Sequence, residues 1–418
     1  MWQRITQHAT VYEYRDPTYL AIHDYRYSKE IFDVEKKSDI EYATASGFWC
    51  SKTGAEDKSY AAILGEGLVN SLMTSKQHLT MDIYMPCGDT TARRPLLLLL
   101  HGGGFYVGDK SDEHIASWCH DFAAKGYVAV SINYRMGFKP TKASVTRTGY
   151  RALQDAHAAM RYLMENAEDY GIDTNMMFVG GTSAGAITAL NLAFMRDKDR
   201  PTETRRHGDL GSIDACGNAY HHEVKIKAVA NMWGAVNSLA LLRNNTCDII
   251  SFHGDADPIV PCNIGYPFSE YGEWIGERVF GKMYGSIPID QRAQEMGMRS
   301  EIYLFPGQGH SLHRNDDGSM NRENYLFIED KITQFFYDEL VATPAQIRES
   351  RNDPRGYYVD GQGLRDISWK VEGGFIMGLD DNTIDIVWRT DAPKHTLTVC
   401  GRYPNGIGFE TTYRQTLD

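Results

Sequence analysis

A serine between glycines is the residue of this 418-residue chain best placed to do chemistry. The stretch GTSAG at 181–185 fits the pattern G-x-S-x-G, after a run typical of a strand and before one typical of a helix. A serine on so tight a turn takes a strained backbone, for which the flanking glycines leave room. The pattern alone is also that of a glycine-rich turn with a capping serine. Its strand-to-helix context therefore carries the prediction that Ser183 is a nucleophile.

A serine hydroxyl needs a base, and the base needs an acid that orients it. After a turn of this kind the acid comes before the histidine in the chain. Asp255 and Asp257 follow one expected strand, in SFHGDADPIVP, and His310 and His313 follow the next, in LFPGQGHSLH. Each alone is a turn-forming aspartate or a structural histidine. Together, at the strand ends where parallel sheets bind ligands, they predict a Ser-Asp-His triad.

Three consecutive glycines follow the most apolar run of the chain, in PLLLLL at 95–100 and HGGGFYVG at 101–108. Glycine loses the most backbone entropy on folding, so such a run needs a reason. Attack of a serine on an ester carbonyl builds a negative oxygen, which needs fixed backbone N–H donors. We predict that Gly103, Gly104 and Ala184 supply them as an oxyanion hole, and that His101 braces this loop. The alternative is a flexible loop at a strand end.

Aromatic residues and two long connections surround the predicted site. Phe105, Tyr106 and Trp233 are candidate walls of an acyl or alcohol pocket, although ordinary packing explains each of them equally well. Residues 200–222 and 262–272 are candidate cap or lid segments. Neither segment shows the long amphipathic helix of a lid that opens on lipid. This favours soluble or polymer-linked esters over insoluble ones.

The elements that must position these residues alternate between strand and helix from about residue 32 to 340. This alternation predicts an α/β fold, with a mostly parallel central sheet flanked by helices. Expected strands cover 78–86, 94–103, 128–134, 176–181, 226–234, 247–254 and 300–307. Expected helices cover 112–127, with Gly126 as the C-cap, and 145–173, 183–196, 271–283 and 324–340.

The pattern changes near residues 342–354, which are polar and rich in turn-forming residues. Short alternating runs follow, and they predict a small β-sandwich-like module over 355–418, close to the lower size limit for independent folding. The catalytic domain is expected over 1–345, with an N-terminal extension at 1–31 that receives no assignment. Residues 47–76 are expected to be an insertion between the first two strands of the sheet.

Composition excludes several classes of protein. The formal net charge is −12, and no cluster of Lys and Arg suggests nucleic-acid binding. The longest apolar run is too short to span a bilayer, and residues 1–20 contain no apolar signal-peptide core. The seven cysteines are scattered without a C-x-x-C pair, which supports neither a zinc site nor a redox motif. We expect no metal and no cofactor; the odd count leaves at least one free thiol and room for one or two disulfides.

These motifs together resemble the α/β-hydrolases of the carboxylesterase/lipase superfamily, close to the hormone-sensitive-lipase-like and type-B carboxylesterase branches. The resemblance covers 39–340 through HGGGFYVG, SINYRMG, RALQDAHAAMRYL, GGTSAG, HGDADPIVP and GQGH. The family acid lies in H-G-x-x-D, which selects Asp257, and the family histidine lies in G-x-G-H, which selects His310. Thr182, where those branches carry Glu or Asp, and Ala186, where the related motif has glycine, leave the subfamily open.

The resemblance implies a metal-independent serine carboxylesterase working through an acyl-enzyme. Short-chain esters, or acetyl and feruloyl esters linked to plant polysaccharides, are the expected substrates. Alternatives are a lipase for longer acyl chains and a serine peptidase of the same fold, which usually brings an N-terminal propeller or a terminal-amine clamp. A non-catalytic binding protein is a further alternative, although such proteins typically lack the nucleophile or the histidine. The C-terminal segment is similar to Ig-like or PKD-like modules of exported bacterial enzymes, which implies export and contact with a glycan or surface.

Overall fold

In a computed structural model of the chain, the described residues are 25–53, 62, 73–206, 208–243, 247–315, 317–341, 344–380 and 382–416. They form two compact units, one over Phe32–Glu339 and one that joins the described residues before Phe32 to those from Leu340 onward. This division differs from the expected catalytic domain over 1–345, which includes residues 1–31. In the structure, the Tyr27 hydroxyl donates to the Asn405 carbonyl within the second unit. Most of the expected insertion at 47–76 lies outside the described residues.

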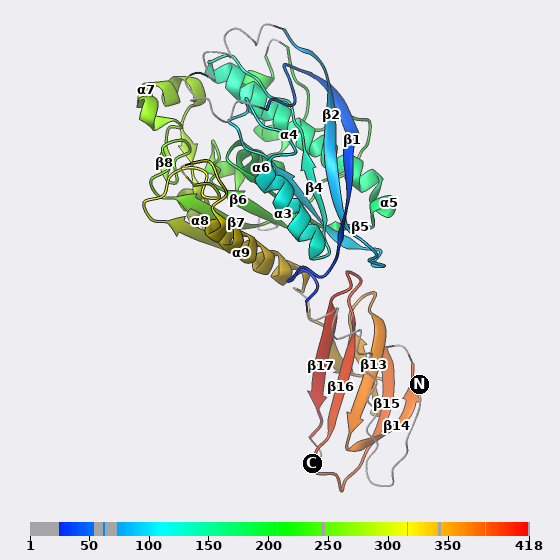
Figure 1. Ribbon diagram of the computed structural model, residues 1–418. Helices are drawn as coiled ribbons and strands as arrows, with labels where there is room; N and C mark the ends of the chain where they lie inside the picture. The colour runs from blue at the N-terminus through cyan, green and yellow to red at the C-terminus, as the bar shows by residue number, and fades with distance from the viewer. Residues whose placement is uncertain are drawn as a thin grey trace. The chain divides into compact units, whose positions relative to one another are not determined.

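An eight-stranded sheet organises the larger unit, in the order β1-β2-β4-β3-β5-β6-β7-β10 (Figure 1). β1 and β2 are antiparallel to their neighbours, whereas all pairings from β4 to β10 are parallel. The five leucines of β3 are at most 2% exposed, because both faces of a central parallel strand are covered. The strand bounds are β1 Val34–Gly47, β2 Ser75–Pro86, β3 Arg94–Leu100, β4 Val128–Ile132, β5 Ile172–Thr182, β6 Ala228–Met232, β7 Asp248–Gly254 and β10 Ser300–Phe305.

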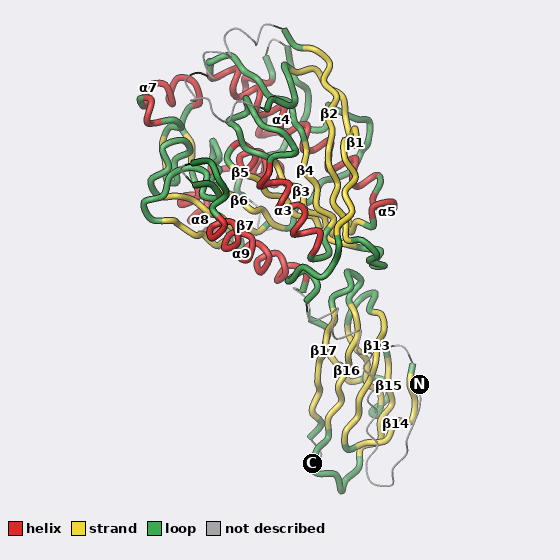
Figure 2. Tube along the Cα trace, in the orientation of Figure 1, coloured by secondary structure: helices red, strands yellow, loops and turns green. Residues whose placement is uncertain are grey.

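Helices pack along this sheet (Figure 2). The Asp112 side chain caps the first of them by accepting from two backbone N–H groups, and Gly126 follows its last turn at φ 111°. Ring stacking between Trp118 and Tyr325, with centroids 5.0 Å apart, holds that helix beside the last helix of the unit. The helices are α3 Glu113–Ala124, α4 Lys142–Glu165, α5 Ala167–Tyr170, α6 Ala184–Phe194, α8 Ser286–Glu295 and α9 Arg322–Leu340.

The helix expected over 271–283 is not a continuous helix. Its residues form short turns named η4 Ser269–Tyr271, α7 Glu273–Ile275 and η5 Gly276–Phe280, followed by β9 Met283–Tyr284, which pairs with β8 Ile264–Gly265. Gly272 at φ 102° and Gly281 at φ 82° take backbone conformations outside the right-handed helix, which interrupts the segment. The sequence analysis did not predict α8, which holds Pro288 in its first turn, where a helix tolerates proline.

The C-terminal strands form two antiparallel sheets, ordered β11-β12-β15-β14 and β13-β16-β17. Both sheets contribute to one apolar core, in which Tyr357 and Ile386 of the first sheet join Trp369 and Val371 of the second. A core shared by two sheets makes this part a small β-sandwich. The strands are β11 Gln346–Glu349, β12 Gly356–Asp360, β13 Arg365–Glu372, β14 Gly374–Leu379, β15 Thr383–Trp388, β16 Thr396–Arg402 and β17 Gly408–Arg414.

The expected fold class, a mostly parallel sheet flanked by helices with a small all-β part after it, is confirmed. All seven cysteines lie in the described part of the chain, and no two of them form a disulfide there. Among the helices of the described ranges, none is both long enough and apolar enough to cross a membrane.

Candidate active site

Ser183 sits on a turn with almost no room around it. β5 ends one residue before Ser183 and α6 begins one residue after, and the serine itself takes φ 52° and ψ −117°. A side chain on Gly185 would place its Cβ 2.2 Å from the Leu100 carbonyl oxygen, and one on Gly181 would come within 2.6 Å of the Gly185 backbone. The Ser183 N–H donates to the Met232 carbonyl at 2.9 Å. Both glycines are therefore needed for the turn to fit against the neighbouring strands.

The three predicted triad residues meet at the carboxyl ends of β5, β7 and β10. His310 Nδ1 lies 2.7 Å from Asp257 Oδ2, and His310 Nε2 lies 2.9 Å from Ser183 Oγ. An ionised aspartate can only accept hydrogen bonds, so the His310 Nδ1 that faces it must carry a proton. The other ring nitrogen, Nε2, is then the acceptor that faces the serine hydroxyl. The Asp257 side chain is fully buried and that of His310 is 8% exposed. The arrangement is an acid, a base and a hydroxyl in one line of hydrogen bonds.

A histidine that the sequence analysis did not single out supports the acid. His253 Nε2 lies 3.3 Å from Asp257 Oδ2 and 3.0 Å from the Val260 carbonyl oxygen, and its Nδ1 faces the Ser286 hydroxyl at 2.8 Å. Burial alone would raise the pKa of Asp257, but hydrogen bonds from His253 and His310 outweigh it and lower the pKa below its ordinary value. His253 is the first residue of the H-G-x-x-D motif, so that motif is the signal that could have identified it.

The two residues left open as alternatives have other contacts. Asp255 Oδ1 accepts from the Gly307 N–H at 2.6 Å, so this carboxylate links the acid loop to the loop that carries His310. His313 is buried, with its ring stacked on Trp233 and edge-on to His114. Burial lowers the pKa of His313 well below its ordinary value. Asp255 therefore joins two loops, and His313 packs in the protein core.

The glycine-rich loop after β3 touches the nucleophile turn. A Cβ on Gly102 would lie 3.4 Å from Ser183 Cβ, and one on Gly103, at φ 96°, would collide with the Val107 carbonyl at 2.1 Å. Gly104 is also left-handed, at φ 60°. The Ala184 N–H is the first of α6, and the first four N–H groups of a helix have no acceptor within it. The predicted donors thus belong to two segments that meet beside Ser183.

His101 braces this loop, as its residue type and position suggested. Its Nδ1 lies 2.8 Å from the Gly102 carbonyl oxygen, and its ring stacks on Tyr134 with centroids 4.3 Å apart. The Tyr134 hydroxyl donates to the His101 carbonyl at 2.7 Å. Burial lowers the pKa of His101, which favours the neutral ring. Tyr134 belongs to the SINYRMG motif, and the sequence analysis had given it no role.

A cavity of about 90 Å³ lies between the glycine-rich loop, α4 and α6. Pro201 of the first candidate cap segment contributes to its wall, and the second segment, 262–272, contributes no lining residue, whereas Phe280 and Met283 beyond it do. The complete lining is Phe105, Val145, Thr146, Gly149, Tyr150, Leu153, Ile187, Thr188, Asn191, Met195, Pro201, Asn237, Phe280 and Met283.

Of the three aromatic residues predicted to wall a pocket, Phe105 lines this cavity and the other two do not. The Tyr106 ring is 1% exposed and packs edge-on against Trp49 and Phe138. The Trp233 ring is fully buried, stacked on His313 and 6.5 Å from the His310 ring. Both rings point into the protein core, which removes them from the wall of this cavity.

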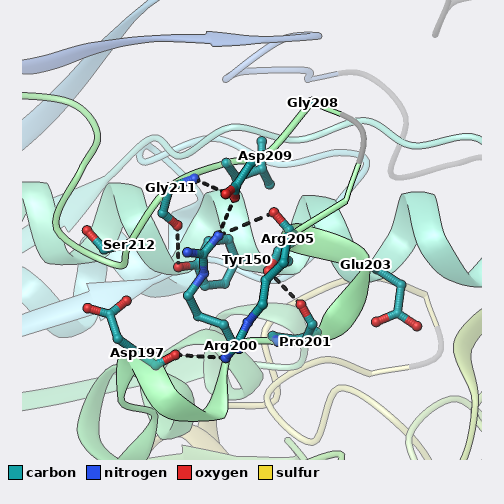
Figure 3. A network of polar contacts seen from close by, with 12 residues as sticks. Tyr150, Asp197, Arg200, Pro201, Glu203, Arg205, Gly208, Asp209, Gly211 and Ser212 are labelled. Atoms are coloured by element: carbon teal, nitrogen blue, oxygen red, sulfur yellow. Dashed lines mark hydrogen bonds and ion pairs between the residues drawn. The ribbon is translucent and has the colours of Figure 1, made fainter.

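The first candidate cap segment is fastened along α4 (Figure 3). Arg147 Nη2 donates to the Gly208 carbonyl at 2.6 Å, the Tyr150 hydroxyl to the Gly211 carbonyl at 2.9 Å, and Gln154 Nε2 to the Leu210 carbonyl at 2.7 Å. These three donors lie on one face of the helix, at intervals of three and four residues. These hydrogen bonds hold the first candidate cap segment, residues 200–222, across α4, and we call this segment the strap. Its motion as a lid stays a prediction.

Known proteins with similar sequences include esterases, a lipase and a neuroligin-like protein. The family model described as BD-FAE matches residues 81–251. Gut esterase 1 of Caenorhabditis elegans is 30% identical over 335 residues, which cover 70% of this chain and 56% of that protein. Juvenile hormone esterase of Heliothis virescens is 27% identical over 165 residues, or 38% of this chain and 28% of that protein. The chain thus spans little more than half the length of the first relative, and less of the second.

Among solved structures, esterase 2 of Thermogutta terrifontis with propionate bound is 20% identical, with a TM-score of 0.44 over 63% of this chain and 89% of that one. The strand order and the Ser183 turn, together with the BD-FAE match, define an α/β-hydrolase. Within that class, the chain is related to the carboxylesterases and lipases.

Proposed function

We propose that the protein is a serine carboxylic-ester hydrolase that works through an acyl-enzyme. The observation that carries this proposal is the line of hydrogen bonds from Asp257 through His310 to Ser183, at 2.7 and 2.9 Å. Most of the related proteins are named as esterases or a lipase, which supports this chemistry.

In the first half of the reaction, His310 Nε2 takes the proton of Ser183 as Oγ attacks the ester carbonyl. The oxygen that becomes negative accepts hydrogen bonds from the N–H groups of Gly103, Gly104 and Ala184. His310 then gives its proton to the leaving alcohol, and the acyl group stays on Ser183. The charge of Asp257 favours the imidazolium form of His310 that exists between these two proton transfers.

In the second half, a water molecule takes the place of the alcohol. His310 removes its proton, the resulting hydroxide attacks the acyl-enzyme, and the same N–H groups hold the second negative oxygen. The proton returns through His310 to Ser183 Oγ as the acid leaves. Bonds and protons balance over the cycle, since one ester and one water become one acid and one alcohol.

The substrates we propose are short-chain esters or acyl groups attached to polysaccharides. The candidate cap segment at 200–222 shows no long amphipathic helix in its described residues and is hydrogen-bonded along α4, which supports soluble or polymer-linked esters over insoluble lipid. Contact of the C-terminal sandwich with a glycan or surface, and export of the protein, stay predictions from the sequence.

The test is hydrolysis of p-nitrophenyl acetate by the wild type and by Ser183→Ala. We expect the substitution to lower kcat by at least about 10⁴-fold, because it removes the attacking oxygen. Ser111→Ala is the matched control, since this exposed serine only contacts Asp109 and should leave the rate unchanged. A fluorophosphonate should label Ser183 once per chain.

Equal inertness of the wild type and Ser183→Ala toward a full ester panel, with no labelling, would refute the proposal and favour a binding protein. Faster cleavage of amides than of matched esters would favour the peptidase alternative.

A further inference from the structure

A group of buried polar side chains leads away from Asp257 into the core of the larger unit, and the proposed reaction does not use it. Its members are Asn231 of β6, Ser251 and His253 of β7, and Ser286 at the start of α8, each 0% exposed. Burial of a polar group costs free energy unless the group is hydrogen-bonded. The direction of each hydrogen bond in the group therefore shows what it does.

The Asn231 amide is fixed in one orientation. Its Oδ1 accepts from the Gly234 N–H at 3.0 Å, so the nitrogen end of the amide faces the two serines. Nδ2 donates to Ser286 Oγ at 3.1 Å and to Ser251 Oγ at 3.0 Å. Asn231 and Ser251 lie opposite each other in the pairing of β6 with β7. One amide group therefore holds two hydroxyl groups, which belong to two different elements.

The Ser286 hydroxyl connects this amide to His253. An amide nitrogen only donates, so Ser286 Oγ accepts from Asn231 and its own proton faces His253 Nδ1 at 2.8 Å. The other ring nitrogen, Nε2, lies 3.0 Å from the Val260 carbonyl oxygen and 3.3 Å from Asp257 Oδ2. Both of these oxygens are acceptors, so Nε2 carries the proton and His253 is a neutral ring. We call Asn231, Ser286 and His253 the Asn231 network.

The Asn231 network opposes a second proton on His253. A proton on Nδ1 would point at a hydroxyl that already accepts from Asn231, and the hydroxyl proton would lose its acceptor in the network. Since the ring is fully buried, a positive charge on it would also lose its hydration. The carboxylate of Asp257 favours a positive charge on either histidine beside it, and the network opposes that charge on one of them.

His310 meets the same carboxylate oxygen in a different setting. Its Nδ1 lies 2.7 Å from Asp257 Oδ2, whereas its Nε2 faces the Ser183 hydroxyl, whose proton the proposed reaction removes. Burial raises the pKa of Asp257, and the hydrogen bond from His253 is the largest of the influences that lower it. The reaction needs the positive charge on His310 alone, because only this ring passes a proton to the leaving alcohol.

We propose that Asn231 and Ser286 are positioning residues of the hydrolase. They hold His253 uncharged with its proton on Nε2, so that the negative charge of Asp257 pairs with His310 when that ring becomes positive. The inference rests on the proposed ester hydrolase function and adds two residues that contact neither the substrate nor the reacting atoms. These residues act on kcat, and Ser286 does so through His253.

The experiment measures kcat and KM for p-nitrophenyl acetate with the full chain. Ser286→Ala removes the hydroxyl that donates to His253 and should lower kcat about 10-fold, the cost of one buried hydrogen bond in a coupled network, with KM unchanged. Ser251→Ala is the matched control, because it removes the other hydroxyl bonded to the same amide, on the branch that does not lead to His253. This control should keep kcat within about 2-fold. The thermal midpoints of both variants record the loss of stability separately.

A double-mutant cycle shows whether Ser286 acts through His253. In the His253→Gln background, Ser286→Ala should change kcat by less than about 2-fold, because the ring on which the hydroxyl acts is gone. If His253→Gln does not fold, the comparison of the two serine variants decides alone.

Equal losses of kcat in Ser286→Ala and Ser251→Ala would overturn the inference, since both would then reflect packing around Asn231. An unchanged kcat in Ser286→Ala would also overturn it, as would an undiminished loss in the His253→Gln background. Failure of the proposed function has a different signature. The wild type itself would then neither hydrolyse p-nitrophenyl acetate nor be labelled at Ser183 by a fluorophosphonate, and the inference would fall with it.

Discussion

At the scale of single residues, the carboxylate of Asp257 receives hydrogen bonds from two sides. Its Oδ1 accepts from the N–H groups of Ile259 and Val260 at 2.8 and 3.0 Å, and its Oδ2 faces His310 and His253. The backbone donors hold the plane of the carboxylate through Oδ1, and the two histidines contact Oδ2. A fully buried acid with this set of donors stays ionised, which keeps the proton of His310 on Nδ1.

The substitution Asp257→Asn tests this role. An amide nitrogen in place of Oδ2 would present a donor to Nδ1 and favour the opposite tautomer of His310, with Nε2 protonated. We expect kcat for a short ester to fall about 10⁴-fold with little change in KM, as in other Ser-His-Asp enzymes. The measurement is a steady-state rate at pH 8. Asp255→Asn is the control, and a loss below 10-fold in Asp257→Asn would contradict the tautomer argument.

At the scale of elements, the contact of α9 with β7 contains two acidic groups. Glu339 of α9 neighbours Asp248 of β7, and burial together with this second carboxyl raises the pKa of Glu339 to about 7. The positive charges of Arg299 and Lys227 lower the pKa of Glu339 but do not cancel this rise. Arg299 Nη1 lies 3.9 Å from Glu339 Oε1. Between about pH 4.3 and this raised value, the folded chain binds a proton that the unfolded chain has released. Folding stability must therefore fall as the pH rises through this window.

Glu339→Gln removes the cost of ionising that carboxyl in the folded state. We expect the variant to match the wild type at pH 5 and to be more stable at pH 8 by about 1 kcal/mol, a value reduced for partial solvent screening. Urea unfolding of the larger unit at the two pH values measures this difference. Asp330→Asn, at an exposed aspartate of the same helix that pairs with Lys331, should show no such gain. A larger stabilisation at pH 5 than at pH 8 would reverse the predicted sign.

At the scale of the whole molecule, the chain holds separate apolar cores. The larger core lies around the eight-stranded sheet, and a second one lies inside the C-terminal sandwich. All three triad residues belong to the larger unit, over Phe32–Glu339. Because each unit encloses its own core, we expect the chemistry to depend on the first core alone.

Val371→Asp tests this independence. Val371 is fully buried between the two sheets of the sandwich, and an unpaired carboxylate there costs several kcal/mol. We expect the sandwich to lose its fixed packing, seen in the fluorescence of Trp369 and Trp388, while the rate on p-nitrophenyl acetate stays within about 2-fold by additivity of distant sites. Thr398→Asp, outward-facing on β16, is the control. Loss of hydrolysis in parallel with the sandwich signal would show that the units depend on each other.

Much of the site follows from local sequence. A turn as tight as that at Ser183 requires glycine at 181 and 185, and a loop that turns left-handed at 103 and 104 requires glycine there. An unbroken apolar run such as that of β3 indicates a strand that is covered on both faces. Since strands, helices and their order along the chain are set by such short-range patterns, the sequence determined the fold class and the chain order serine, acid, histidine.

The direction of each side chain at a strand end was decided only by the tertiary structure. Asp255 and Asp257 share one loop, as do His310 and His313, and the residues alone left each choice open. The path of the loops turns Asp257 and His310 toward Ser183, whereas Asp255 bonds to Gly307 and His313 stacks on Trp233. These contacts join residues more than fifty positions apart, so no local pattern carries them.

The cavity also exists only in three dimensions. Phe105 comes from the loop after β3, Ile187 from α6, and Pro201 from a strap held by side chains of α4. Tyr106, next to Phe105 in the chain, points into the core, and the expected helix over 271–283 is broken by glycines whose φ angles depend on their packing. The sequence by itself determined which chemistry we propose for the chain. Only the tertiary structure decided which side chains meet and which space stays open between them, because both depend on the distances between segments that are far apart in the chain.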